Sequence, residues 1–295
     1  MNSWEALLLG VVEGITEYLP ISSTGHLILT AALLGLNEPE ATRQAVNAFV
    51  IVIQGGAILA VLGLYRHRVA QMARGLAGGD AVGRKLAINL FISFLPAAVL
   101  GVLLDDLIDR HLFSEWPVIG ALFVGGVLML LIGPWQRRVF HAARDIDHPD
   151  ATSFVDIEHL TWRRALIIGL LQCVAMWPGT SRSMMTIVGG MAVGLRPRHA
   201  AEYSFLLGLP TLGGACVYKT AQLLLGESDP LVLLGGWQPV IVGLVAATVS
   251  AALAVKWLVS YLTRHGLALF GWYRLILSAV FAALLWHGGL SITPE

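Results

Sequence analysis

The stretches Pro20-Ile21-Ser22-Ser23-Thr24-Gly25 and Pro178-Gly179-Thr180-Ser181-Arg182-Ser183 decide the expected fold, because each interrupts a long apolar segment near its middle. The interrupted segments are residues 4–36 and 166–195. The arms beside each break have only about 14–17 residues, fewer than the roughly 20 that a helix needs to cross a bilayer. Non-helical backbone is tolerated at membrane depth only where protein or water surrounds it. Each segment is therefore predicted to form a re-entrant pair of short helices.

The composition indicates an integral membrane protein. Charged residues make up 13% of the 295 residues and hydrophobic residues 56%, and the mean hydropathy is +0.73. A soluble protein carries about twice that share of charge. The formal net charge is zero, which argues against nucleic acid as a partner because such binding needs a clustered basic face. Cys173 and Cys216 lie in apolar runs without metal-ligand spacing and are interpreted as small buried residues.

Six further segments are long and apolar enough to span a bilayer. Together with the interrupted segments, they predict an all-α polytopic protein built as a re-entrant pair plus three transmembrane helices, twice over. Three is odd, so the second copy is expected to be inverted in the membrane. The predicted repeats are residues 1–136 and 162–295, joined by a cytoplasmic linker at 137–161. The predicted spans are residues 45–65, 86–104, 117–135, 203–225, 239–258 and 268–286.

The interrupted segments also resemble each other. Gly10-Val11-Val12-Glu13 aligns with Gly169-Leu170-Leu171-Gln172 and, after a one-residue gap, Pro20-Ile21-Ser22-Ser23 aligns with Pro178-Gly179-Thr180-Ser181. Paired broken helices in two inverted halves indicate a binding site near the middle of the membrane. The two turns are therefore predicted to meet.

Loop charges set the expected orientation. The segment Arg66–Lys85 and the region 137–164 are rich in arginine, which places them in the cytoplasm. The loop at 105–115 is mostly acidic and is placed outside. Arg264 and Arg274 are assigned to the last cytoplasmic turn. Both termini are then expected outside, with the first re-entrant pair entering the membrane from the outside and the second from the cytoplasm.

Glu13 and Glu17 are the first candidates for function, because ionisable groups at membrane depth are costly and usually functional. Their spacing puts both carboxylates on one helical face. Two such close carboxylates favour a divalent cation, Mg²⁺ or Ca²⁺, or a shared proton. The alternative is that both side chains extend to the outer membrane surface.

Ser22-Ser23-Thr24-Gly25-His26 places hydroxyl groups beside an imidazole. A serine hydroxyl needs a base to act as a nucleophile, and histidine suits that role near neutral pH. Serine and threonine also cap helices, which is the alternative interpretation.

The second turn has the features of an anion site. A turn that opens a helix offers unpaired backbone N–H groups, and Arg182 adds a planar guanidinium that matches phosphate oxygens. Alternatively, Arg182 simply pairs with Glu13 or Glu17. Gln54 lies within a span and is expected to hydrogen-bond to a turn or to a neighbouring helix.

The motifs Glu13-Gly14-Ile15-Thr16-Glu17-Tyr18-Leu19-Pro20-Ile21-Ser22-Ser23-Thr24-Gly25-His26 and Trp177-Pro178-Gly179-Thr180-Ser181-Arg182-Ser183-Met184-Met185-Thr186 resemble the two signature motifs of the bacterial undecaprenyl-diphosphate phosphatases of the bacitracin-resistance type. The resemblance covers nearly the whole chain. It implies hydrolysis of a polyprenyl diphosphate lipid to the monophosphate, which recycles the lipid carrier of peptidoglycan synthesis. It also implies an inverted-repeat fold, a periplasmic active site and, often, a homodimer.

The resemblance also implies roles for individual residues. Glu13 and Glu17 correspond to glutamates assigned to metal binding or water activation. Ser23 and His26 correspond to a nucleophile and an acid/base, and Arg182 corresponds to the diphosphate-binding arginine. The neighbouring hydroxyls and one glutamine are expected to bind substrate: Ser22, Thr24, Ser181, Ser183, Thr186 and Gln54. One departure is Met184, where many members of the family have glycine.

A transporter or flippase for polyprenyl phosphate is the rival hypothesis, because inverted repeats with broken helices are the usual architecture of alternating access. In that case Glu13 and Glu17 carry protons or cations, and Arg182 holds the anionic substrate. A purely structural role leaves the intramembrane ionisable residues unexplained.

Overall fold

The computed structural model describes residues 1–36, 40–112, 114–135, 138–139, 154–225 and 234–287. Within them the chain is helical, with no β-strand and only an isolated bridge between Val155 and Leu195. The helices of the first half are α1 (Ser3–Tyr18), α2 (Ser23–Leu33), α3 (Glu40–Leu64), α4 (Arg66–Leu76), α5 (Ala81–His111) and α6 (Glu115–Leu131). Those of the second half are η2 (Ile157–His159), α8 (Trp162–Val174), α9 (Arg182–Ala192), α10 (Pro197–Leu225), α12 (Trp237–Leu262) and α13 (Ala268–Trp286).

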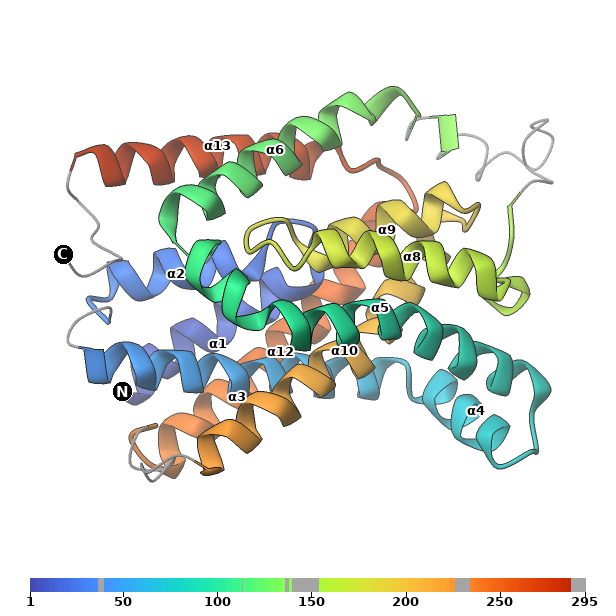
Figure 1. Ribbon diagram of the computed structural model, residues 1–295, viewed down its shortest axis with the longest axis horizontal. Helices are drawn as coiled ribbons and strands as arrows, with labels where there is room; N and C mark the ends of the chain where they lie inside the picture. Colours follow the sequence, from blue (N-terminus) through green and yellow to red (C-terminus); the bar gives the residue numbers. More distant parts are fainter. Residues whose placement is uncertain (37–39, 113, 136–137, 140–153, 226–233, 288–295) are drawn as a thin grey trace.

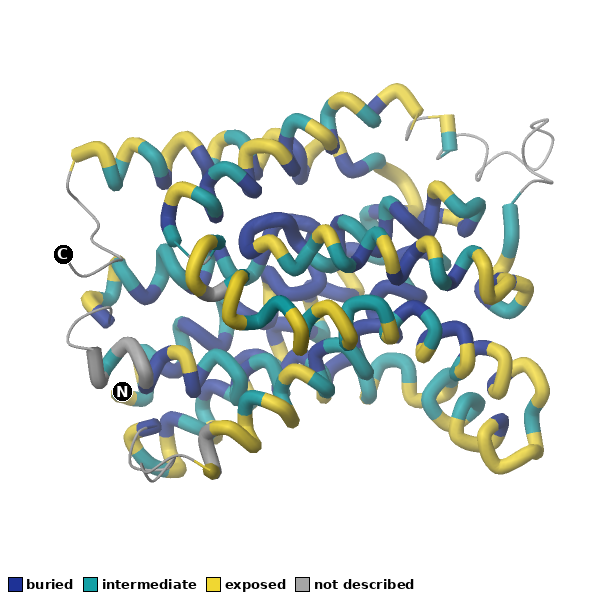
Figure 2. The backbone as a smooth tube through the Cα atoms, viewed as in Figure 1, coloured by how far each residue is buried: buried dark blue, intermediate teal, exposed yellow. Residues whose placement is uncertain are grey.

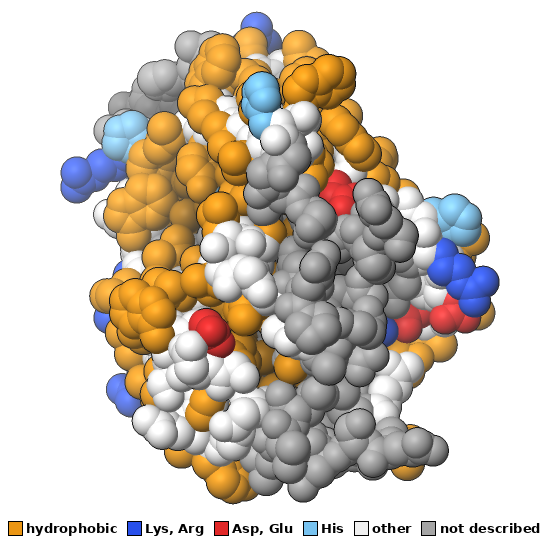
Figure 3. Space-filling view, turned by 90° about the vertical axis from the view of Figure 1, so that its left-hand side faces the viewer, with side chains coloured by type: hydrophobic (Ala, Val, Ile, Leu, Met, Phe, Trp, Pro, Cys, Tyr) orange, Lys and Arg blue, Asp and Glu red, His pale blue; other side chains and the backbone are white. Residues whose placement is uncertain are grey.

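The protein is a multi-pass membrane protein. Among the described residues, four helical segments are long and apolar enough to cross a membrane: Ala45–Leu64, Ala81–Ile108, Trp237–Leu262 and Ala268–Trp286. Helices also form at the other two predicted spans, in α6 and α10. Large apolar side chains are exposed along these helices, and apolar side chains cover much of the described surface in Figure 3. The number of crossings, the inverted arrangement and the repeat boundaries stay predictions.

Both interrupted segments form pairs of short helices, as expected. α1 and α2 are separated by a turn at residues 19–22, and α8 and α9 by a turn at residues 175–181. The arms have 16, 11, 13 and 11 residues. α1 packs along α12 of the other half, and α8 packs along α5 in the same way. The two turns therefore lie in the middle of the molecule, in its most buried part (Figures 1 and 2).

The segments predicted to be cytoplasmic gather at one end of the molecule. Figure 1 shows α4 and the beginnings of α5 and α8 at the right, whereas the beginning of α1 and the end of α13 lie at the left. Arg68 of α4 donates to Glu158 and Glu202, over 2.9 and 2.8 Å, and so ties three of these segments together. α4 itself is a correction, because residues 66–85 were expected to form only a loop. Most of the predicted linker lies outside the described residues.

Candidate active site

The two turns have the same backbone conformation. Ser22 and Ser181 have φ values of 72° and 77°, and they are the only non-glycine residues with positive φ in the described part of the chain. Each caps the 11-residue helix that follows it: Ser22 Oγ accepts from the Gly25 amide at 3.4 Å, and Ser181 Oγ from the Met184 amide at 3.3 Å. The capping interpretation is thus confirmed for Ser22, and Ser181 caps α9 in the same way. Such a backbone costs roughly 1–3 kcal/mol per residue and is found mainly at functional sites.

Corresponding residues of the two interrupted segments are separated by a constant number of positions, from α1 and α8 through the turns to α2 and α9. Gly10 of α1 lies against α12, and Gly169 of α8 lies against α5. These glycines are separated by the same number of residues as the two strained serines. The alignment therefore runs from arm to turn without a break, and the predicted one-residue gap is wrong. In this register Ser23 corresponds to Arg182, each being the first residue of its short helix.

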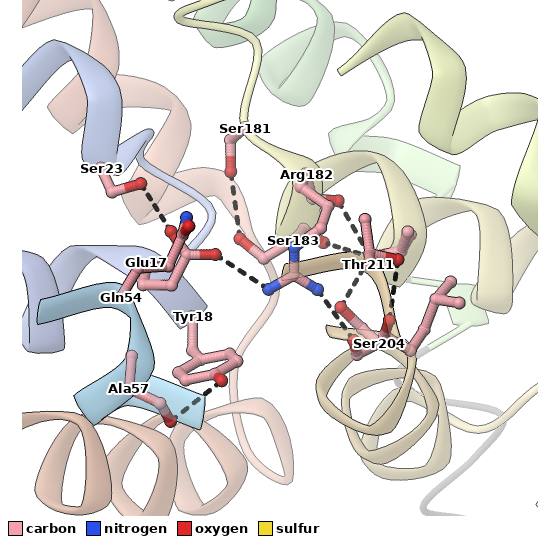
Figure 4. A network of polar contacts seen from close by, with 12 residues as sticks. Glu17, Tyr18, Ser23, Gln54, Ala57, Ser181, Arg182, Ser183, Ser204 and Thr211 are labelled. Carbon is pink, nitrogen blue, oxygen red and sulfur yellow. Dashed lines mark hydrogen bonds and ion pairs between the residues drawn. The ribbon is translucent and has the colours of Figure 1, made fainter. Parts of the chain in front are cut away.

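Glu17 joins the two turns. Its Oε2 accepts a hydrogen bond from Ser23 Oγ at 2.7 Å, and its Oε1 accepts from Arg182 Nη2 at 3.0 Å (Figure 4). Arg182 also donates from Nη1 to the Ser204 carbonyl at 3.0 Å, and its guanidinium lies 5.6 Å from the centre of the Tyr18 ring. The side chains of Glu17 and Arg182 are 5% and 10% exposed. The predicted meeting of the turns is confirmed, and Glu17 does not extend to the membrane surface.

His26 hydrogen-bonds to groups other than Ser23. Its Nδ1 lies 2.7 Å from the Ser22 carbonyl, which can only accept, so Nδ1 carries the proton. Its Nε2 then accepts from the Tyr273 hydroxyl at 2.7 Å, and the two rings are stacked. Both ring nitrogens are therefore occupied. The expected hydrogen bond between His26 and Ser23 is not present in this structure, and Glu17 accepts the hydrogen bond from the Ser23 hydroxyl instead.

Buried polar atoms remain without partners around this centre. Both carboxylate oxygens of Glu13, the amide nitrogen of Gln172 and Nε of Arg182 have no hydrogen-bond partner among the described residues. Gln172 corresponds to Glu13 in the register of the two halves. Burying an isolated carboxylate is expensive unless a cation, a proton or donors neutralise it. The unpaired atoms therefore mark a place for polar ligands.

A divalent cation fits part of this set. Glu13 is 1% exposed and offers two free oxygens, which are the ligands that Mg²⁺ and Ca²⁺ prefer. Within the described residues, however, no group of three or more His, Cys, Asp or Glu side chains is arranged to hold a metal. Mg²⁺ is commonly held by one or two carboxylates together with substrate phosphates. Glu13, with Glu17 nearby, suits binding that the substrate completes.

The remaining predicted substrate-binding residues have mixed surroundings. Ser183 Oγ donates to the Leu19 carbonyl at 2.8 Å, which ties one turn to the other. Thr186 is fully buried and bonds to the Arg182 carbonyl at 2.9 Å and to Ser204 Oγ at 2.6 Å. Both hydroxyl groups therefore hydrogen-bond to other protein groups and hold segments of the chain together in this structure.

The other three are Ser181, Gln54 and Thr24. Ser181 Oγ is 3.0 Å from Ser183 Oγ. Gln54 accepts from Cys216 at 3.4 Å, which confirms its expected contact with a neighbouring helix. Thr24 is partly buried in the first turn of α2.

Sequence reasoning missed two residues that hold the turns, Tyr273 and Arg274 of α13. Arg274 is fully buried, although it was assigned to a cytoplasmic turn. It donates to the carbonyls of Gly179 and Thr180 at 2.7 and 2.9 Å. The signal was present, because Arg274 lies inside the apolar segment 268–286, where an ionisable residue is a functional candidate by default.

Comparison with known proteins identifies relatives along almost the entire chain. The family model described as "Bacitracin resistance protein BacA" matches residues 6–280. A protein of Sorangium cellulosum named undecaprenyl-diphosphatase is 44% identical over 286 residues, which are 96% of this chain and 85% of the relative. Undecaprenyl-diphosphatase 2 of Rhodospirillum rubrum is 43% identical over 97% of this chain and 96% of its own length. An undecaprenyl-diphosphatase of Acinetobacter baumannii is 43% identical over 94% of this chain and 93% of its own.

Proposed function

The chain belongs to the bacitracin resistance protein BacA family, and from this premise we infer that it hydrolyses undecaprenyl diphosphate to undecaprenyl phosphate and inorganic phosphate. The reaction regenerates the lipid carrier for cell-wall synthesis, and its connection with bacitracin resistance follows from the family. The observation that carries the assignment to this site is the double contact of Glu17 with Ser23 and Arg182. The comparisons give no support to the rival transporter reading.

Ser23 is the nucleophile that this geometry favours. Its hydroxyl already donates to Glu17 Oε2 at 2.7 Å, so Glu17 can take the proton as Oγ attacks the terminal phosphorus. A bond forms between Ser23 Oγ and that phosphorus, and the bond to the bridging oxygen breaks, which releases undecaprenyl phosphate. Water then hydrolyses the phosphoserine and regenerates Ser23. In the alternative mechanism, Glu17 activates a water molecule that attacks the phosphorus directly.

Arg182 and the two helix N-termini supply positive charge for the phosphate oxygens. Phosphoryl transfer depends mainly on positioning and on stabilising the charge of the equatorial oxygens. Nε of Arg182 is buried and unpaired, so it is free to bind an oxygen, whereas Nη1 and Nη2 are engaged with Ser204 and Glu17. Substrate that displaces Glu17 from Nη2 gains a second donor and leaves Glu17 free to accept the Ser23 proton.

Glu13 and Glu17 would hold a divalent cation, Mg²⁺ or Ca²⁺. When bound, the cation neutralises charge on the diphosphate. The two unpaired oxygens of Glu13 are the support for this proposal. Glu13 would thus contribute to binding of the cation, while Glu17 remains hydrogen-bonded to the nucleophile Ser23.

The lipid tail is proposed to lie in an apolar groove of about 1000 Å³ between α1 and α12. Its α1 wall is Leu7, Val11, Ile15 and Leu19, on the face of the helix opposite Glu17. Leu19 lies at the turn, next to the catalytic residues, so a chain leaving the site around Leu19 enters the groove. Ile15→Trp should raise KM for a long polyprenyl diphosphate and leave KM for a short-chain diphosphate unchanged. Equal effects on both substrates would exclude this groove.

The site is proposed to face the periplasm of a bacterial inner membrane, and the protein to form a homodimer as the family resemblance implies. The support for the orientation is the arginine content of the end opposite the beginning of α1 (Figure 1). In intact cells, a membrane-impermeant thiol reagent added from outside should modify the thiol that Ser23→Cys introduces. Modification of that thiol only from the cytoplasmic side would contradict this orientation.

Phosphate release in detergent micelles tests the activity itself. Purified protein should release inorganic phosphate from undecaprenyl diphosphate without any membrane gradient, whereas a transporter would release none. A mock preparation from cells that do not express the protein serves as the control for a contaminating phosphatase. Equal release by both preparations would refute the assignment.

A further inference from the structure

Arg274 is a buried cation whose bonding partners are carbonyl groups. Besides Gly179 and Thr180, it donates to the α6 carbonyls of Ala121 and Leu122, at 2.9 and 3.3 Å. No carboxylate contacts it within the described residues. Its positive charge is therefore stabilised by carbonyl dipoles alone, two of which belong to the turn that leads to Arg182.

The neighbouring helix is shaped to accept this side chain. Gly125 of α6 lies directly against the Arg274 guanidinium, and an added Cβ would overlap it. The turn itself fits tightly on α6, because Gly179 lies close to the Val118 carbonyl and has a φ of 97°. Trp177 Nε1 adds a hydrogen bond to the Pro117 carbonyl at 3.1 Å. α6 and α13 thus form a support behind the second turn.

The bond from Arg274 to Thr180 fixes the direction of an amide group. In a planar trans peptide the C=O and the next N–H point in opposite directions. Because the Thr180 carbonyl points to Arg274, the Ser181 N–H points away from the Arg274 guanidinium. This N–H has no hydrogen-bond partner among the described residues. It is an unused donor at the N-terminus of α9.

The first turn is held in an equivalent way by the preceding residue of α13. Tyr273 donates to His26, and His26 donates to the Ser22 carbonyl at 2.7 Å. The Ser23 N–H of that peptide therefore points away from His26, and it too has no partner in the described chain. Adjacent residues of one helix thus orient one amide in each turn.

We propose that Arg274 is a positioning residue, which holds the Thr180–Ser181 peptide so that the Ser181 N–H binds an oxygen of the diphosphate. Tyr273 does the same through His26 for the Ser23 N–H. This inference rests on the proposed phosphatase activity. Together the two amides form a pair of preorganised donors for the charge that develops on the transferred phosphoryl group.

Substitution of Arg274 tests the proposal through kcat. Arg274→Lys keeps the charge but cannot bridge the carbonyls of Gly179 and Thr180. We expect kcat per folded molecule to fall about 10- to 100-fold with KM changed less than about threefold, since a preorganised donor acts mainly on the transition state. Arg274→Gln should lower kcat by at least the same factor. Ser278→Ala, a buried change on α13 away from both turns, should leave kcat unchanged.

Two further variants keep the test decisive if the Arg274 variants do not fold. Gly125→Ala displaces the guanidinium from the other side, and Tyr273→Phe removes the hydrogen bond to His26. Each should lower kcat per folded molecule about tenfold, and Tyr273→Phe should do so with a melting temperature close to that of the wild type. Wild-type kcat in folded Arg274→Lys or, failing that protein, in Gly125→Ala would overturn the proposal. An inactive wild-type protein would refute the phosphatase assignment instead.

Discussion

The turns at residues 19–22 and 175–181 share a backbone conformation but differ in the chemistry of the residues around them. Both pass through a strained serine and open an 11-residue helix. At the first position of that helix, one has Ser23 and the other Arg182. The preceding arms differ in the same way, with Glu13 in one and Gln172 in the other. The fold thus supplies two equivalent helix N-termini. The first turn carries the carboxylates and the nucleophile, whereas the second carries the cationic side chain.

Among the single changes that test this difference between the turns, Ser23→Ala should reduce turnover the most. It removes the nucleophile and the hydrogen bond to Glu17, and we expect turnover to fall about 10³-fold or more, as for loss of a catalytic nucleophile. Phosphate release by purified protein measures it. Ser260→Ala on α12 is the matched control. Turnover within tenfold of the wild type would show that Ser23 is not the nucleophile and would favour direct attack by water.

Arg182→Lys tests the cationic turn. Lysine keeps the charge but loses the planar set of donors that contacts Glu17 and Ser204, so turnover should fall roughly 10²–10³-fold. Thermal stability measured on the same preparation separates catalysis from folding. Arg264→Lys, in the exposed segment before α13, is the control. A well-folded Arg182→Lys protein with near wild-type turnover would mean that Arg182 does not bind the phosphate.

Glu13→Gln tests the difference between the two arms, because it gives the first arm the amide that the second already has in Gln172. We expect turnover to fall about 10- to 100-fold and to depend less on added Mg²⁺ or Ca²⁺, since one carboxylate ligand is gone. Exhaustive chelation should inactivate the wild type. Full activity after chelation would exclude a role for a cation.

Replacing the strained serines should have the smallest effect and the same effect on both sides. Ser22→Gly and Ser181→Gly each relieve a positive φ and lose a cap that is worth only a few tenths of a kcal/mol relative to glycine. Each should raise stability by up to about 1 kcal/mol, measured as thermal unfolding in detergent. A clear gain at one turn and a clear loss at the other would show that the two backbones are not equivalent.

Much of this arrangement was predictable from sequence. The breaks at Pro20 and Pro178 located both turns, and the segment 268–286 has the bounds of α13. Pairing of Arg182 with Glu13 or Glu17 was the alternative interpretation of Arg182, and its contact with Glu17 agrees with that alternative. These features depend on composition and local pattern, which a single sequence contains.

The missed features depend on which groups meet in space. Arg274 follows Lys256 and Arg264 in the sequence, so counting charges grouped it with them in the last cytoplasmic turn. Its partners are carbonyl groups, and every residue has one. His26 is adjacent to the serines in sequence, but its side chain turns toward Tyr273 of a distant helix. The one-residue gap arose because matching Pro20 with Pro178 increased the apparent similarity, whereas the backbone pairs Ser22 with Ser181.

The most direct test of the shared centre compares Glu17→Gln, Arg182→Gln and the protein that carries both changes. Each single change leaves a buried charge unpaired and should lower stability by about 3–5 kcal/mol, and the double change should recover much of that loss because no unpaired charge remains. Turnover should stay at least about 10³-fold below the wild type in all three, because the proton acceptor, the phosphate clamp or both are missing. A double variant that regains both stability and turnover would contradict the account, because it would reduce Glu17 and Arg182 to a structural ion pair.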